Sequence, residues 1–383
     1  MRKLQKFTLP ALIGIFLLIL AACGGDDESD TTSAPAATSA PVAAATSAPA
    51  ASTGGTTGAS FEFQYVCVNR TLLPCQVIQE FIDSVEERTD GQIEIQISSY
   101  PELGISGFDM IRLLEDGTIG LGEIYSGFVG GEFPTFEAAN LWGAYGNLDQ
   151  WFEASEALGD DIINLVRRET GGGEIVGFNY YPSNYFFTKG PLKTLSDFKG
   201  VKTRTHSVVL GDLISTLGAN PQTMAFADVY PALERGVLDG AATCGSCAIG
   251  QKWFEVTEHI TGPIPGSWAQ TFVTFNVTQW NSLPADFQAI IREEGALHSV
   301  RAKARSVKAD AEAEGDLIEF GMNHSTFSPE MMVIIKNAAQ STVIPNWAER
   351  AGGFESEAVQ LYNEKVGPVT GLYVLPDGSV EKR

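Results

Sequence analysis

The sequence predicts an α/β protein of two domains that are braced by one long helix. Strand, helix and strand patterns alternate over residues 61–124 and again over 201–238, which is typical of parallel sheets. The chain has 383 residues, enough for about two domains with a large core. After Leu283-Pro284, a helical pattern runs from Asp286 to about Glu314, long enough to reach both domains.

The first 23 residues have the pattern of a secretion signal. Three basic residues precede an apolar run from Leu9 to Leu20, and Leu20-Ala21-Ala22-Cys23 resembles a bacterial lipobox. An uncleaved membrane anchor is the alternative, but the apolar run is shorter than the ~20 residues that a span needs. We therefore predict a lipoprotein signal peptide over 1–23, with Cys23 as the lipidated residue that holds the protein on the bacterial cell membrane.

Residues 24–60 are predicted to be a disordered tether. They are mostly Gly, Asp, Ser, Thr, Ala and Pro, and this composition cannot bury enough apolar surface to fold. Such a tether would give reach to a lipid-anchored domain.

The charge balance is strongly acidic, with 47 Asp and Glu residues against 25 Lys and Arg. It argues against nucleic acid as a partner, because a phosphate backbone requires a basic face. An anionic small molecule is still compatible with it, since one buried arginine sets the local field.

The first folded stretch alternates strands and helices. Phe61–Val68, Gln92–Ser98 and Ile119–Ile124 are predicted strands, and Val77–Thr89 and Gly107–Glu115 are predicted helices. This order predicts an open parallel sheet with a ligand site beyond the carboxyl ends of its strands. The loops at those ends contain Arg70 and Tyr125.

The middle of the chain continues the α/β pattern. Asp149–Arg168 is a predicted helix, and Glu174–Asn179 is a strand that begins the passage into the second domain. Thr271–Val277 is a strand in the passage back, and the tail after Gly371 has no packing pattern.

The stretch from Leu192 to Cys247 carries the clearest functional signal. Val201–Ser207 and Pro221–Phe226 are predicted strands, and Ser207–Leu217 and Ala227–Leu238 are predicted helices. Arg204 lies in the middle of the first strand. A guanidinium is always charged and can donate two parallel hydrogen bonds to a carboxylate.

Three segments of this stretch resemble the solute-binding proteins of TRAP (tripartite ATP-independent periplasmic) transporters, the DctP-type family. They are DFKGVKTR, LGANPQTMAFADVYPAL and ERGVLDG, in this order and spacing, and a weaker resemblance covers residues 61–366. The resemblance implies a periplasmic-binding-protein-like fold with a ligand cleft between two domains. We predict domain I over 61–181 plus about 270–310, domain II over 182–269 plus about 311–366, and a tail over 367–383.

The resemblance also implies roles for individual residues. Arg204 would grip the carboxylate of the solute, Phe226 would line the pocket, and Thr243 stands where the family often has a hydrogen-bonding Asn. Asn184 stands where some members have a second arginine, which favours a monocarboxylate or keto acid unless Arg70 supplies a second charge. The predicted ligand contacts are Arg204, Phe226, Thr243, Asn184, His206, Ser207, Tyr125 and Arg70.

Four cysteines remain besides Cys23: Cys67, Cys75, Cys244 and Cys247. An even number in an extracytoplasmic chain favours disulfides, and three pairings are possible, of which the local ones close short loops. A four-cysteine zinc site and a redox role for Cys244-Gly-Ser-Cys247 are the alternatives. The redox role is disfavoured because the motif follows a predicted helix end, where the dipole does not lower a thiol pKa.

No enzyme motif is found: the four histidines lack ligand spacing and no phosphate loop occurs. We therefore expect a lipid-anchored extracytoplasmic protein, without cofactor or metal, that captures a small organic acid and delivers it to a TRAP membrane permease. The alternatives are a ligand-sensing accessory protein for a membrane signalling receptor and a secreted cysteine-centred redox or metal protein.

Overall fold

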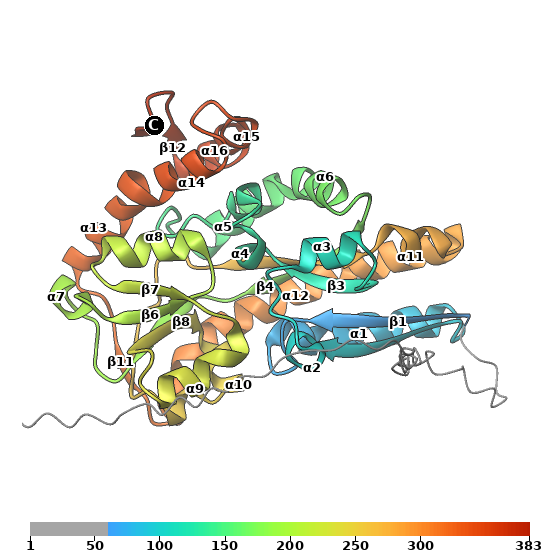
Figure 1. The fold of residues 1–383 in the computed structure, drawn as a ribbon, viewed down its shortest axis with the longest axis horizontal. Helices are drawn as coiled ribbons and strands as arrows, with labels where there is room; N and C mark the ends of the chain where they lie inside the picture. The colour runs from blue at the N-terminus through green and yellow to red at the C-terminus, as the bar shows by residue number, and fades with distance from the viewer. Residues whose placement is uncertain (1–59) are drawn as a thin grey trace, which may run out of the picture. The chain divides into compact units, whose positions relative to one another are not determined.

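The computed structural model describes residues 60–383, and Figure 1 shows its helices and strands. The predicted signal peptide, Cys23 and the predicted tether lie outside these described residues. None of the helices described is long and apolar enough to cross a membrane.

The first sheet has five strands in the order β2-β1-β3-β10-β4. β1 pairs in parallel with β2 on one side and with β3 on the other, and β10 runs antiparallel to both β3 and β4. Its strands are β1 (Phe61–Cys67), β2 (Ile93–Ser99), β3 (Leu121–Tyr125), β4 (Glu174–Tyr181) and β10 (Ala269–Phe275).

The second sheet has six strands in the order β11-β9-β5-β8-β6-β7. β6 is parallel to β7 and β8, while β5 is antiparallel to β8 and β9. Its strands are β5 (Asn184–Thr188), β6 (Lys202–Thr205), β7 (Asn220–Thr223), β8 (Gly240–Cys244), β9 (His259–Thr261) and β11 (Asn323–Ser325). The chain therefore enters this sheet directly after β4 and returns to the first sheet at β10.

Helices cover both sheets. Those before β5 are α1 (Leu73–Arg88), α2 (Tyr100–Leu103), α3 (Met110–Glu115), α4 (Ser126–Val129), η1 (Pro134–Glu137), α5 (Leu148–Ala157) and α6 (Gly159–Glu169). Those between β5 and β10 are α7 (Leu195–Phe198), α8 (Val208–Thr216), η2 (Phe226–Asp228), α9 (Val229–Glu234), α10 (Gly245–Gly250) and η3 (Trp253–Glu255). The later ones are α11 (Val277–Ser282), α12 (Ala285–Glu319), α13 (Pro329–Ala338), the π-helix Ala339–Val343, α14 (Ile344–Arg350), α15 (Glu357–Lys365) and α16 (Gly367–Thr370).

The long helix α12 contacts elements of both sheets. It packs against β4 and α1 and, further along, against α10 and β11. Two sheets joined by one long helix confirm the predicted α/β fold with a bracing helix. The exact domain boundaries stay a prediction.

α12 approaches the first sheet closely because it carries a glycine at the contact. A Cβ on Gly295 would lie 1.8 Å from the carbonyl oxygen of Val176 in β4, which leaves no room for a methyl group. By contrast, a Cβ on Gly315 of the same helix would meet no atom within 4 Å.

We expect Gly295→Ala to destabilise the protein by roughly 2 kcal/mol or more, since α12 must move away from β4. Gly315→Ala is the matched control, because alanine there gains helix propensity of about 1 kcal/mol without a clash. Urea denaturation of both variants measures the difference. Equal stability changes in the two variants would contradict the close contact between α12 and β4.

The structure corrects several predicted elements. The helix predicted over Asp149–Arg168 is two helices, α5 and α6, which are separated at Leu158, a residue that is fully buried. The short helices α2 and α4 occupy two of the predicted loops. The prediction of an unpacked tail is wrong, because β12 (Leu372–Val374) pairs with β13 (Val380–Lys382) and Leu372 and Val374 are buried.

Candidate functional site

Arg204 is the most unusual charged residue of the described chain. It lies on β6 with 1% of its surface exposed. Its Nε donates to the carbonyl oxygen of Met224 at 3.1 Å, and its Nη1 donates to that of Ala242 at 3.4 Å. Among residues 60–383, its Nη2 has no hydrogen-bond partner and no carboxylate offsets its charge.

Burial lowers the pKa of Arg204 to about 10, so the guanidinium is still cationic at neutral pH. The guanidinium carbon lies 5.6 Å from the centre of the Phe226 ring, which offers it a π face. A buried cation without an anionic partner is costly, and such groups are normally paired. The site therefore has the electrostatics of an anion receptor.

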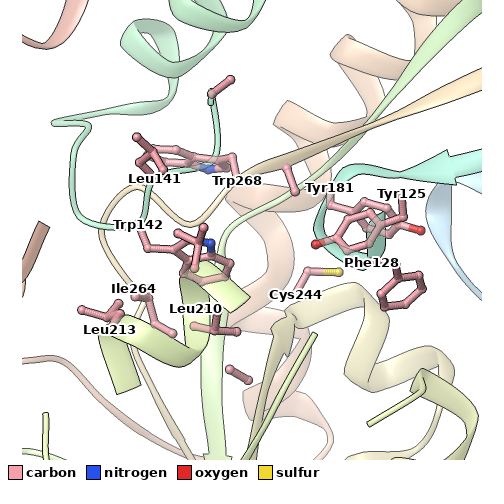
Figure 2. Packing of buried hydrophobic residues seen from close by; sticks show 14 of the residues in the cluster. Tyr125, Phe128, Leu141, Trp142, Tyr181, Leu210, Leu213, Cys244, Ile264 and Trp268 are labelled. Carbon is pink, nitrogen blue, oxygen red and sulfur yellow. The ribbon is translucent and has the colours of Figure 1, made fainter. Parts of the chain in front are cut away.

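Arg204 borders a small pocket with a cavity volume of about 30 Å³. The pocket lies between residues of the two sheets, which confirms the predicted cleft. Figure 2 shows Cys244 from the second sheet below Tyr125 and Tyr181 from the first, with Phe128 beside them. The lining consists of Val68, Leu72, Tyr125, Phe128, Tyr181, Asn184, Arg204, His206, Phe226, Thr243, Cys244 and Cys247.

A hydrogen-bonded chain crosses the pocket between the two sheets. The Tyr125 hydroxyl, at the end of β3, lies 3.0 Å from Nδ1 of His206, which follows β6. Nε2 of His206 lies 3.4 Å from Oδ1 of Asn184, and the Asn184 amide donates to the carbonyl oxygen of Ser267 at 2.6 Å.

Burial, and then the charge of Arg204, hold the pKa of His206 well below its ordinary value. The imidazole is therefore neutral at pH 7. It links the two sheets as a hydrogen-bonding group, and Arg204 supplies the positive charge of the pocket.

This arrangement suits a small anion with an apolar body. Arg204 offers the NH2 group of its Nη2 as an unused donor, and the remaining walls are mainly aromatic and aliphatic. Charge-assisted hydrogen bonds strengthen in such a water-poor site, and binding pockets commonly combine apolar walls with a few fixed polar groups.

Six of the eight predicted ligand contacts line this pocket: Arg204, Phe226, Thr243, Asn184, His206 and Tyr125. Ser207 does not line it, and its hydroxyl accepts a hydrogen bond from the backbone N–H of Leu210 as the N-cap of α8.

Arg70 is also placed outside the pocket lining. Its side chain is half exposed and its Nε contacts Oε1 of Glu102 at 2.6 Å, while another guanidinium nitrogen donates to the carbonyl oxygen of Ile97. Glu102 reaches Arg70 because the capping box of α2 fixes its carboxylate near the end of β2. Arg70 therefore supplies no second charge to the pocket in this structure.

Sequence reasoning missed several lining residues. Tyr181 lies two residues beyond the end of the predicted strand Glu174–Asn179, and its hydroxyl is buried. Val68 and Leu72 lie between the first two cysteines of the folded part. The signal that would have found them is the position of all three residues at the carboxyl ends of first-sheet strands.

The structure pairs the cysteines locally, Cys67 with Cys75 and Cys244 with Cys247. In this arrangement the two sulfurs of Cys244-Gly-Ser-Cys247 bond to each other. The expected position of this motif is wrong: Cys244 is the N-cap of α10, and its sulfur accepts a hydrogen bond from the backbone N–H of Cys247. The motif begins a helix because β8 and α10, which the sequence patterns did not reveal, follow α9.

Comparison with known proteins gives one family match. The model of the family described as bacterial extracellular solute-binding protein, family 7 (DctP) matches residues 69–350. The C4-dicarboxylate-binding periplasmic protein DctP of Vibrio cholerae is 32% identical over 181 residues. That match covers 46% of this chain and 52% of the relative, so the chain spans about half the length of this curated relative.

Solved structures show the same fold. DctP7 of Bordetella pertussis, an extracytoplasmic solute receptor binding pyroglutamic acid, superimposes with a TM-score of 0.73 at 20% identity and covers 79% of this chain and 99% of that one. A TRAP periplasmic solute-binding protein of Desulfovibrio salexigens with bound orotic acid gives a TM-score of 0.72 at 21% identity, with 80% and 99% covered.

Proposed function

Because the chain belongs to family 7 of the bacterial extracellular solute-binding proteins, the DctP family, we propose that it captures a small organic acid and delivers it to a TRAP-type membrane permease. The proposed ligand lies in the pocket between the two sheets, with its carboxylate on Arg204. The proposed role is binding and delivery, without catalysis.

One observation carries this proposal: Arg204 is a buried cation with a free Nη2 at the wall of a pocket. A ligand carboxylate would supply the missing negative charge and accept hydrogen bonds from the N–H groups of Nη2. The guanidinium fork matches a carboxylate in geometry as well as in charge.

We further propose that the ligand has a single carboxylate. Arg204 is the sole cation among the pocket-lining residues within 60–383, and Asn184 uses its side chain on Ser267 and His206. A second carboxylate would have to be desolvated against Val68, Leu72 or Phe128 without a counter-charge, which is unfavourable. Pyroglutamic and orotic acid, bound by two structural neighbours, are acids of this kind.

Closure of the cleft would couple binding to recognition by the permease. The Tyr125–His206 contact joins the two sheets. In addition, Nε2 of Gln251, which follows α10 beside the second sheet, donates to Oγ1 of Thr71, which follows β1 of the first sheet, at 2.9 Å. A ligand that touches both walls favours the arrangement in which these contacts form, so it shifts the population toward the closed state.

Anchoring and disulfides are part of the same proposal. Cys23 would be lipidated, and the chain before residue 60 would tether the binding domain to the membrane. Cys67–Cys75 and Cys244–Cys247 would be oxidised, and both would hold pocket-lining segments in place. Four oxidised cysteines in a thiol titration of the denatured, unreduced protein would support this state.

The Cys244–Cys247 pair gives the cysteine-centred alternative some support, because a cysteine that caps a helix accepts a backbone hydrogen bond that stabilises a thiolate. Both sulfurs are buried in the pocket wall, however, where a protein partner cannot reach them. Reactive thiols in the native protein would favour this alternative. A sensory role would share the same ligand site and differ in its membrane partner.

A thermal-shift screen tests the proposed ligand class. Small monocarboxylic, dicarboxylic and keto acids are added to the purified full chain, each beside its neutral amide. Binding to the native state alone stabilises by RT ln(1 + [L]/Kd), about 2.7 kcal/mol at a hundredfold excess over Kd. We expect a monocarboxylic or keto acid to raise Tm and its amide to have no effect. Equal shifts from acid and amide would contradict recognition of charge.

A further inference from the structure

The outer face of α12 carries an apolar stripe that the binding function does not use. Its members are separated by three and four residues in alternation, with Glu314 at the one polar position in the series. The stripe consists of Leu297, Val300, Ala304, Val307, Ala311 and Ile318. All six are exposed, and Val300 reaches 69%, Leu297 52%, Ile318 48% and Val307 43%.

This stripe lies opposite the face that packs on the protein. The buried residues of the same region include Ile291, Ala302, Ala313 and Leu317, which lie about half a helical turn away from the stripe. A helix that covers a single core is normally polar on its outer face. α12 is therefore apolar on two opposite sides, as is a helix that packs against two neighbours.

The spacing of residues in the stripe indicates which kind of element could pack on it. Apolar residues at alternating intervals of three and four form the seam of two helices that pack side by side. Along α12 the seam from Leu297 to Ile318 is roughly 33 Å long at 1.5 Å per residue. A neighbour that matched this seam would be a helix that runs along most of α12.

The charges of α12 are segregated along its length. From 296 to 308 the charged residues are all basic, namely Arg301, Lys303, Arg305 and Lys308. From 309 to 319 they are all acidic, namely Asp310, Glu312, Glu314, Asp316 and Glu319. The midpoint of the stripe lies between Val307 and Lys308, and the charge changes sign next to it, between Lys308 and Asp310.

We propose that the stripe binds the same stripe of a second copy of this chain, in antiparallel orientation. A two-fold axis near Val307 would place Leu297 against the partner's Ile318 and Ala304 against the partner's Ala311. The basic half of each helix would then lie beside the acidic half of the other. A parallel pair would instead bring like charges together, which is unfavourable. Two identical stripes satisfy the self-complementarity that a two-fold interface requires.

The neighbours of α12 leave this face open. Arg301 and Arg305 contact Glu80 of α1 on one side of the stripe, and Lys303 contacts Glu156 of α5 on the other side. These ion pairs are partly exposed and therefore weak. The basic side chains can therefore still interact with acidic side chains of a partner helix. α1 and α5 thus flank the stripe without covering it.

Sedimentation equilibrium of the full chain tests the pairing, at concentrations up to about 100 µM because dimer formation follows mass action. We expect a dimer for the parent and at least a tenfold larger dissociation constant for Val300→Asp. Val333→Asp is the matched control, since Val333 is a 56% exposed valine on α13 and lies off the stripe. A monomeric parent, or equal effects of the two substitutions, would overturn the proposal.

Cysteine cross-linking tests the orientation. Val307→Cys lies near the proposed axis, so mild oxidation is expected to link two copies of this variant through residue 307. Ile318→Cys should not link to itself, because the axis places it opposite the partner's Leu297. The parent chain gives the baseline for its existing cysteines. Cross-linking of Ile318→Cys with none of Val307→Cys would overturn the antiparallel arrangement.

Discussion

Replacing Arg204 with methionine is expected to weaken ligand binding at least about thirtyfold and to leave the ligand-free protein at least as stable as the parent. In the ligand-free structure the guanidinium is buried, and its Nη2 has no partner among residues 60–383. Methionine fills similar volume without a charge to desolvate. With ligand present, removal of one partner of a buried charge pair costs about 2–5 kcal/mol, which weakens binding by roughly thirtyfold to several thousandfold.

Arg204→Lys is the control that separates charge from shape. Lysine keeps the positive charge but offers a point charge in place of a planar fork, so binding should be intermediate between parent and methionine variant. Calorimetric titration gives the affinities, and urea denaturation gives the ligand-free stabilities. A methionine variant that loses stability and keeps its affinity would show that Arg204 is a structural residue.

The second large effect concerns Glu137, a buried carboxyl at the end of η1. Both of its oxygens are buried, and burial raises its pKa to about 8. The hydroxyl of Ser207, and then the charge of Arg350, oppose this rise in pKa only in part. At neutral pH the folded protein therefore holds a proton on Glu137 that the unfolded chain, with an ordinary pKa of 4.5, has released.

This difference makes stability depend on pH with a defined sign. The contribution of Glu137 is fully present below pH 4.5 and is lost as pH rises through about 8. Between these values the free energy of unfolding falls by about 1.4 kcal/mol per pH unit from this group. Glu137→Gln keeps the shape and cannot ionise, so we expect this slope to disappear and the variant to be more stable than the parent at pH 8.

Urea denaturation at pH 6, 7 and 8 measures the slope. Glu364→Gln is the control, because the side chain of Glu364 is 72% exposed and should leave the slope of the parent unchanged. A Glu137→Gln variant with the same pH dependence as the parent would show that Glu137 is ionised in the folded protein.

The sequence predicts the structure best in segments with a clear hydrophobic pattern, above all where such a segment also carries a chemically distinctive residue. Arg204 stands in a short β-prone run that is followed by a helical pattern, and the structure places it on β6 and in the lining of the pocket. The strand patterns around Ile93, Ile95 and Ile97 gave β2 for the same reason, since one buried face imposes alternation.

Long-range contacts were beyond the reach of such patterns. Arg70 is predicted near the ligand because its loop follows β1, but it pairs with the carboxylate of Glu102 in α2. β5 and β8 were missed because both are buried along their whole length and show no alternation. Because β8 is not recognised in the sequence, the helix that begins at Gly245 is not predicted either. Cys244 is therefore placed after a helix end, although it stands at the start of a helix.

A crystal structure of the protein with the best acid from the thermal-shift screen tests the central claim most directly. We predict a carboxylate oxygen about 3 Å from Nη2 of Arg204, between walls from both sheets. A ligand bound with its carboxylate turned away from Arg204, or bound outside this pocket, would contradict it.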